Sequence, residues 1–206
     1  SDKTVSECIV PIIRNVDLIK GSEVIGEADI ALNNKAASDY ILQRKFKSER
    51  IQEKYDFIFF DSHSAHSKAT NNAMFISDSI ISVINPDMFS YNGIQPVIST
   101  TEDISLALNR DVRFSILINN FEPNQTNQKE VVKKLVADYG DYILSNFVKR
   151  SADFVRATME NKPFYCFSGN NSNAIKDYSG LLDEFIEISS RKSAEAQDTE
   201  VVSGQA

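Results

Sequence analysis

One carboxylate and both histidines of the chain lie close together in the sequence DSHSAH, residues 61–66. Asp61, His63 and His66 are the ligand types of a two-histidine, one-carboxylate metal site, which would suit a metal-dependent hydrolase. Asp61 also ends the apolar run YDFIFF, residues 55–60. A carboxylate at the end of a buried strand is suited to orient a nucleotide-bound magnesium ion. A cap at a strand end is the third, purely structural role that the pattern leaves open.

The elements that would position these residues alternate between short apolar runs and amphipathic stretches. Runs without polar interruption predict strands, and apolar residues at three- and four-residue spacing predict helices. The expected strands are ECIVPII, YDFIFF (a central strand buried on both faces), SIISVIN, RFSILIN, DYILSNFV and the short extended KPFYCF. Two helical segments are expected between about 17 and 54, and further helices near 71–77 and at 93–108, 127–139, 152–161 and 175–188. This order predicts an α/β fold, with a mostly parallel sheet flanked by helices on both faces.

Two helix starts carry recognisable caps. Asn127 followed by Glu130 resembles a capping box, and Ser151 is the expected N-cap of the helix at 152–161. In parallel sheets, ligands bind at the carboxyl ends of the strands. The residues of interest are therefore those that follow each strand, including Asp61, Asn119 and Lys149.

Composition narrows the possible classes of protein. The 206 residues, 42% hydrophobic and 25% charged, predict one globular domain at 1–188 and a flexible polar tail at 189–206. No run approaches the roughly 20 apolar residues of a membrane span, and Cys8 and Cys166 fit no metal spacing. We expect a cytoplasmic protein with reduced thiols and no membrane contact. The net charge of −7 disfavours a broadly basic nucleic-acid-binding surface.

Residues 55–100 resemble the central segment of the ParA/Soj-type DNA partition ATPases, the deviant-Walker relatives of MinD. The corresponding features are Asp61 after the apolar run, the Asn72-Ala73-Met74 element, SDSIISVINPDMF and Gly93. The likeness continues in order over residues 8–188. The K-G-G-x-x-K-[ST] phosphate loop of that family is not in the sequence. The resemblance therefore implies the carboxy-terminal two-thirds of a P-loop NTPase-like fold, without the first strand and P-loop, or a protein that naturally lacks them.

The resemblance also implies ATP and magnesium as cofactors of the complete protein. Asp61 matches the Walker B acid, which reaches magnesium through water. Asn119 matches the residue that reads the adenine edge. Lys149, Arg150 and Ser151 match the loop that closes over the base, and Pro163 matches the proline of the G-K-P motif. Family members have two prolines where this chain has His63 and Ser64, so the histidines are expected in a switch loop or at a partner interface.

Partners follow from the same resemblance. It implies an ATP-dependent homodimer, nonspecific DNA, association with the nucleoid, and a ParB-like centromere-binding protein that stimulates hydrolysis. The DNA candidates come from the basic stretch at 129–162 and are Lys133, Lys134 and Arg156; a solvated helix surface is the alternative. The rival hypothesis is a non-catalytic ParA-like scaffold or partner-binding domain that has lost ATP hydrolysis. The 206-residue chain alone is expected to be inactive as an ATPase.

Overall fold

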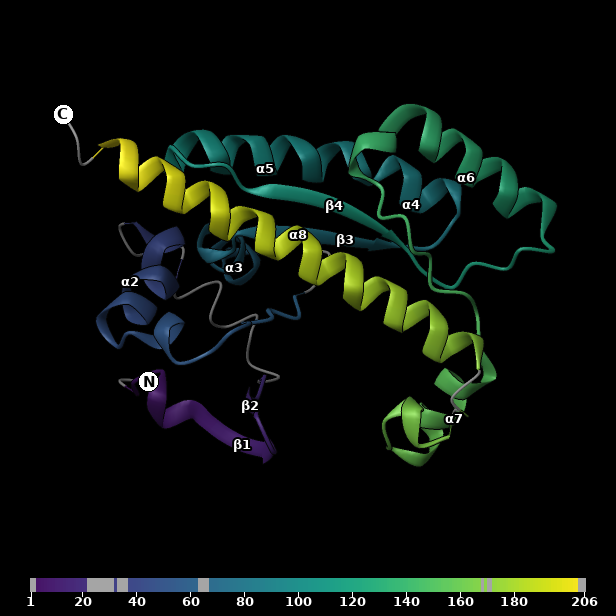
Figure 1. Cartoon of the computed structure of the whole chain (residues 1–206), viewed down its shortest axis with the longest axis horizontal. Helices are drawn as coiled ribbons and strands as arrows, with labels where there is room; N and C mark the ends of the chain where they lie inside the picture. Colours follow the sequence, from purple (N-terminus) through teal and green to yellow (C-terminus); the bar gives the residue numbers. More distant parts are fainter. Residues whose placement is uncertain are drawn as a thin grey trace. The chain divides into compact units, whose positions relative to one another are not determined.

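The computed structural model describes residues 3–21, 32, 37–62, 67–167, 169 and 172–203, with side chains to residue 190. The chain divides into two compact units. Unit 1 contains Ser1–Ile80 and Thr101–Val112, and unit 2 contains Ile81–Thr100 and Arg113–Ala206. Figure 1 shows these elements coloured along the sequence, from purple at the N-terminus to yellow at the C-terminus. Among the described residues, no helix has the length and apolar character that crossing a bilayer requires.

Unit 1 begins with an antiparallel hairpin. Its elements are β1 (Ile9–Ile13), β2 (Val16–Ile19), α2 (Ile41–Ser48), α3 (Lys68–Ile76) and the 3-10 turns Ser6–Cys8, Ser38–Tyr40 and Ile51–Glu53. The strand expected at 7–13 is confirmed over Ile9–Ile13. The first helical segment expected from residue 17 is wrong at its start, and its apolar positions Val24, Ile25 and Ala28 lie outside the described residues. Asn15 adopts a left-handed conformation, with φ of 63°, and the tight turn that it makes pairs β2 with β1.

The core of unit 1 is a cluster of buried apolar side chains. Val5, Phe46, Ile51 and Ile76 are buried, and Ile9, Leu42, Tyr55, Ile58 and Phe60 pack against them. This cluster joins α2 and α3 to the segment at 55–60, and α2 uses the apolar face that the spacing of Leu42 and Phe46 indicated.

The run at residues 55–60 is not the buried strand that its composition predicted. It has no assigned strand structure. Ile58 and Phe60 face the core, whereas Phe57 is 49% exposed and Phe59 is 74% exposed. This alternation is typical of extended chain with one face covered. The prediction failed because an apolar run favours an extended backbone, while strand formation also depends on a neighbouring strand that the run does not specify.

Unit 2 contains the strands that organise the candidate site. Its elements are the end of β3 (Ser79–Ile84), α4 (Met88–Asn92), the start of α5 (Ile94–Leu108), β4 (Arg113–Ile118), α6 (Thr126–Tyr139), α7 (Ala152–Glu160), α8 (Asn173–Ser203) and the 3-10 turns Gly140–Tyr142 and Phe164–Cys166. β3 and β4 are neighbours in the sheet, as a parallel α/β fold requires. α8 runs along β4 (Figure 1), and Arg113 on β4 donates to the carbonyl of Ile188 on α8.

An extended segment at residues 143–149, here called the edge segment, lies parallel to β4. Bridges join Ile116 to Ile143 and Phe121 to Lys149, and the N–H groups of Leu144 and Val148 donate to Ile116 and Ile118. The strand expected from DYILSNFV is thus an extended segment with isolated bridges rather than a continuous strand.

Helix starts and turns differ from the expectations in detail. The N-cap of α6 is Gln125, which makes no side-chain cap bond; Asn127 lies inside the first turn, so the capping-box prediction is wrong. Ser151 is confirmed as the N-cap of α7, because its side chain accepts from the N–H of Asp153. KPFYCF forms a 3-10 turn rather than extended chain, since Phe164 folds back onto Phe154. α8 continues to Ser203, through residues that were expected to form a polar tail.

Candidate nucleotide-binding site

Asp61 lies in unit 1, directly after the extended segment at 55–60. Its side chain is exposed, so it is accessible for a magnesium-bound ligand. His63 and His66, the other members of the alternative metal site, lie outside the described residues. Among the residues that the structure describes, no group of three or more histidine, cysteine or acidic side chains is arranged to hold a metal ion. The three-residue metal site therefore stays a prediction.

In unit 2, Asn119 follows β4 and lies beside the end of β3. Its N–H donates to the carbonyl of Ile84 at 2.8 Å, and the next residue, Asn120, turns the chain with a φ of 56°. Asparagine tolerates this left-handed conformation better than most residues. The turn brings Phe121 against the end of the edge segment.

The residues after β4 and those after the edge segment are joined by backbone hydrogen bonds. The N–H of Phe121 donates to Val148 at 3.1 Å, and the N–H of Arg150 donates to Phe121 at 3.1 Å. The Arg150 guanidinium also reaches Glu122 at 3.0 Å. The structure thus brings residues 119–121, which include the predicted Asn119, and residues 148–150, which include the predicted Lys149 and Arg150, to one place at the carboxyl end of β4.

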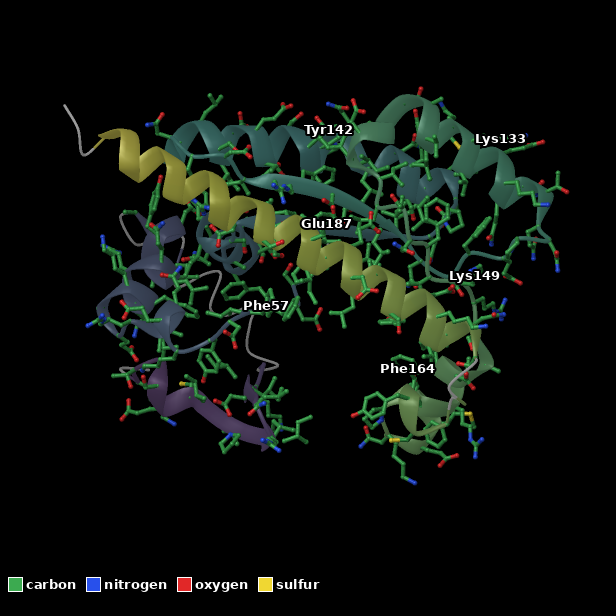
Figure 2. The ribbon with its side chains drawn as sticks, viewed as in Figure 1. Phe57, Lys133, Tyr142, Lys149, Phe164 and Glu187 are labelled. Atoms are coloured by element: carbon green, nitrogen blue, oxygen red, sulfur yellow. The ribbon has the colours of Figure 1, made fainter. Side chains whose placement is uncertain are left out.

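Lys149 points toward α8. Its ammonium lies 2.7 Å from Asp177 Oδ1, and its backbone N–H donates to Oδ2 of the same carboxylate at 2.9 Å. Asp177 is only 8% exposed, and a carboxylate that is this buried needs a positive partner. Figure 2 shows Lys149 beside α8.

Arg150 and Ser151 border a recess at the start of α7. Its volume is about 460 Å³. The walls combine two guanidiniums with exposed apolar side chains, and the lining residues are Arg150, Ser151, Ala152, Val155, Arg156, Met159 and Glu160. Pro163 begins the 3-10 turn after α7 and is not among these lining residues. The recess is an amphiphilic surface large enough for part of a small ligand.

The three DNA candidates differ in how they are engaged. Lys133 is exposed on α6 (Figure 2), and within the described part of the chain it takes part in no ion pair. Lys134 contacts Asp138 at 2.9 Å and lies 4.5 Å above the ring of Tyr91. Arg156 contacts Glu160 at 3.0 Å and stacks over Phe167.

These contacts shift the pKa values of Lys134 and Asp138 on α6. The hydrogen bond with Asp138, followed by that with Tyr91, raises the pKa of Lys134. The same two partners, in the order Lys134 and Tyr91, lower the pKa of Asp138. Lys134 therefore stays charged, but its charge is already shared with a carboxylate, so Lys133 is the more available of the two lysines.

Sequence reasoning missed the carboxylates of α8. Glu184 accepts from the N–H of Ser145 at 2.6 Å, from the N–H of Asn146 at 3.0 Å, and from Asn146 Nδ2 at 2.9 Å. Burial alone would raise the pKa of Glu184, but these donors outweigh it and the pKa lies below its ordinary value. The sequence feature that could have revealed them is the position of two acidic residues, Asp177 and Glu184, within the apolar stripe of the last helix.

The structure is that of an α/β protein with a parallel sheet and flanking helices. A family model described as an AAA domain (AAA_31) matches residues 1–114, and the chain belongs to this family. The resemblance to ParA-type partition ATPases, expected from residues 8–188, is confirmed.

Three known proteins illustrate the similarity. Uncharacterized protein Rv1708 of Mycobacterium tuberculosis is 23% identical over 85% of this chain and 54% of its own length. Sporulation initiation inhibitor protein Soj of Bacillus subtilis is 20% identical over 79% of this chain and 64% of its own length. The structure of a plasmid partition protein (BB_S35) from Borrelia burgdorferi bound to AMPPNP superposes with a TM-score of 0.72, at 20% identity, over 90% of this chain and 70% of that one. The chain thus spans little more than half the length of the first of these relatives.

Proposed function

We propose that this chain belongs to a ParA-type ATPase that binds ATP with magnesium, dimerises in the ATP-bound state and segregates DNA. The observation that carries the proposal is the hydrogen-bonded junction of residues 119–121 with residues 148–150, at the carboxyl end of β4. In parallel α/β folds, this edge is where ligands bind. The AMPPNP bound to the similar Borrelia protein supports a nucleoside triphosphate as the ligand.

Each predicted residue has one role in this proposal. Asp61 orients magnesium through water, and magnesium neutralises charge on the β- and γ-phosphates when it is bound. Asn119 reads the adenine edge. The loop at residues 149–151 closes over the base, with Lys149, Arg150 and Ser151 as its members. Pro163 is the proline of the G-K-P motif and stands directly before the 3-10 turn Phe164–Cys166. Phosphoryl transfer to water is slow until a partner completes the site.

The proposed partners are a second copy of the protein, nonspecific DNA and a ParB-like centromere-binding protein, in the cytoplasm and on the nucleoid. Of the DNA candidates, Lys133 is the first choice because Lys134 and Arg156 each share their charge with a carboxylate. Phosphate contacts of this kind weaken steeply with salt. Exchanging Lys133 for Gln should therefore lower DNA affinity and reduce its salt dependence.

The test of nucleotide chemistry uses the full-length native protein and compares two aspartates of one segment. Replacing Asp61 with Asn should lower ATP hydrolysis about a hundredfold, because an electrostatic contact to the reacting phosphates is lost. Replacing Asp56 with Asn is the matched control, since Asp56 is also exposed, and hydrolysis should be unchanged.

Binding of a fluorescent ATP analogue, with and without magnesium, completes the test. Binding without hydrolysis by the wild-type protein would favour the non-catalytic scaffold, and equal hydrolysis by the Asp56 and Asp61 variants would remove Asp61 from the site. The 206-residue chain alone should bind weakly, because a phosphate loop is not in its sequence. Tight, magnesium-dependent binding of the ATP analogue by the 206-residue chain would contradict the expectation that ATP binding depends on a phosphate loop.

A further inference from the structure

Backbone N–H groups on the two sides of the edge segment donate to different kinds of acceptor. On one side, the N–H groups of Leu144 and Val148 donate to carbonyls of β4. The other side would present the unpaired N–H groups of a sheet edge, which need partners when they are partly buried. In the part of the chain that the structure describes, these partners are side chains of α8 rather than another strand.

Two carboxylates on α8, two turns apart, accept these outward N–H groups. Glu184 accepts from Ser145 and Asn146, near the start of the edge segment. Asp177 accepts from Lys149, at its end, with an N–O distance of 2.9 Å. Because Lys149 is the first residue of the 149–151 loop, Asp177 acts on that loop directly, whereas Glu184 acts four residues earlier.

Asp177 also determines where the Lys149 ammonium lies. The Nζ–Oδ1 distance is 2.7 Å, and the carboxylate is 8% exposed while the lysine side chain is 42% exposed. Moving the ammonium to a ligand would leave a buried carboxylate without its cation, which is costly. Lys149 is, in addition, not among the residues that line the recess beginning at Arg150.

We propose that Asp177 is the positioning residue of the 149–151 loop, and that Lys149 acts through its ion pair with Asp177 rather than through contact with the nucleotide. This inference rests on the proposed function and deepens it. With Asp177 fixing the Lys149 backbone and Phe121 fixing that of Arg150, the loop is ordered before a ligand arrives. Preorganisation of this kind reduces the entropy lost on binding.

The first measurement is hydrogen exchange of the backbone amides in the ligand-free, full-length protein. Asp177→Asn should raise exchange at residues 149–151 about tenfold, because the loop opens more readily. Asp183→Asn is the matched control: it removes the same charge from an exposed position of the same helix, and the loop should be unaffected. Unchanged exchange in Asp177→Asn would overturn the positioning role.

The second measurement compares binding of ATP, GTP and tripolyphosphate. Asp177→Asn should weaken ATP about tenfold and reduce the preference for ATP over GTP, while tripolyphosphate, which has no base, binds as before. A structural loss affecting the whole protein would weaken all three ligands alike, and that outcome would contradict the proposal. Should Asp177→Asn fail to fold, Lys149→Met is carried through both measurements instead.

A double-mutant cycle decides how Lys149 acts. If Lys149 works through Asp177, then Asp177→Asn, Lys149→Met and the double variant should lose similar ATP affinity. Losses that add in the double variant would show that Lys149 contacts the nucleotide itself. If the wild-type protein binds no ATP, the proposed function fails, and the exchange experiment still decides whether Asp177 orders the loop.

Discussion

Asn72 is the side chain in unit 1 whose removal has the most predictable consequence. It is 5% exposed and uses both ends of its amide. Oδ1 accepts from the N–H of Leu42 at 3.0 Å, while Nδ2 donates to the carbonyls of Ser38 at 2.7 Å and Lys68 at 2.8 Å. One residue on α3 thus fixes the turn at Ser38–Tyr40 and the start of α2.

Replacing Asn72 with Ala leaves the Leu42 N–H and the Ser38 carbonyl without this partner. A buried polar group left unsatisfied costs about 1–3 kcal/mol. Leu42 is only partly buried, whereas Ser38 is 6% exposed, so water can compensate the first loss better than the second. We therefore expect a loss of about 2–4 kcal/mol in the free energy of unfolding of unit 1. The Lys68 carbonyl keeps its backbone hydrogen bond within the helix, so losing the Asn72 side chain there adds little to the loss of stability.

The assay combines urea unfolding, followed by far-ultraviolet circular dichroism, with hydrogen exchange at residues 38–42. Exchange resolves the local loss even if the two units unfold separately. Asn71→Ala is the control, because Asn71 is its neighbour on the same helix and is less buried; its effect should stay within about 0.5 kcal/mol. A matching result for Asn72→Ala and Asn71→Ala would refute the reasoning from unsatisfied groups.

Two further predictions concern other contacts of the fold. Donation from the N–H groups of Val5 and Ser6 lowers the pKa of Glu49 below its ordinary value of 4.5, so its contribution to stability is present above about pH 4.5 and is lost as the pH falls through the lowered value. Hydrogen exchange of residues 5–8, measured between about pH 6 and about pH 3, should show this loss of stability, and Glu49→Gln should remove its pH dependence. If the Glu49→Gln variant kept the wild-type pH profile, Glu49 would not be the source of the pH dependence. A Cβ added at Gly180 on α8 would collide with Asn146 Oδ1, the side chain that donates to Glu184. Overpacking should outweigh the gain in helix propensity, so Gly180→Ala should destabilise the folded protein by about 1 kcal/mol in thermal unfolding. Ser179→Ala is the control for a helix position without such a collision. If Gly180→Ala stabilised the protein as much as this control, Asn146 would be moving aside without cost.

The sequence predicts the helices better than the strands. Apolar spacing located α2, α6 and α8, because a helix makes its backbone hydrogen bonds within itself and only its apolar face depends on the rest of the fold. The hairpin strand β2 was missed because Asn15, a single left-handed residue, reverses the chain before any helical pattern can start. The run at 55–60 was misassigned because the pairing of a strand is a property of two segments, and a local pattern describes only one of them.

In the candidate site, too, residues marked by a local pattern were predicted, and residues that depend on a distant partner were not. The residues that follow β4 and the edge segment were predicted as site residues because the end of an apolar run marks the ligand-binding edge of a parallel sheet, and the structure places the two segments side by side. Asp177 was not found, because a carboxylate on the last helix has no local feature that names its partner 28 residues earlier. Yet an acidic residue inside an apolar helical stripe is costly to bury unless something binds it. In a chain whose last helix packs on a sheet, that cost is itself a signal: the acid should be matched to a segment with unpaired N–H groups, and Lys149 at the end of the edge segment provides both such a group and a cation.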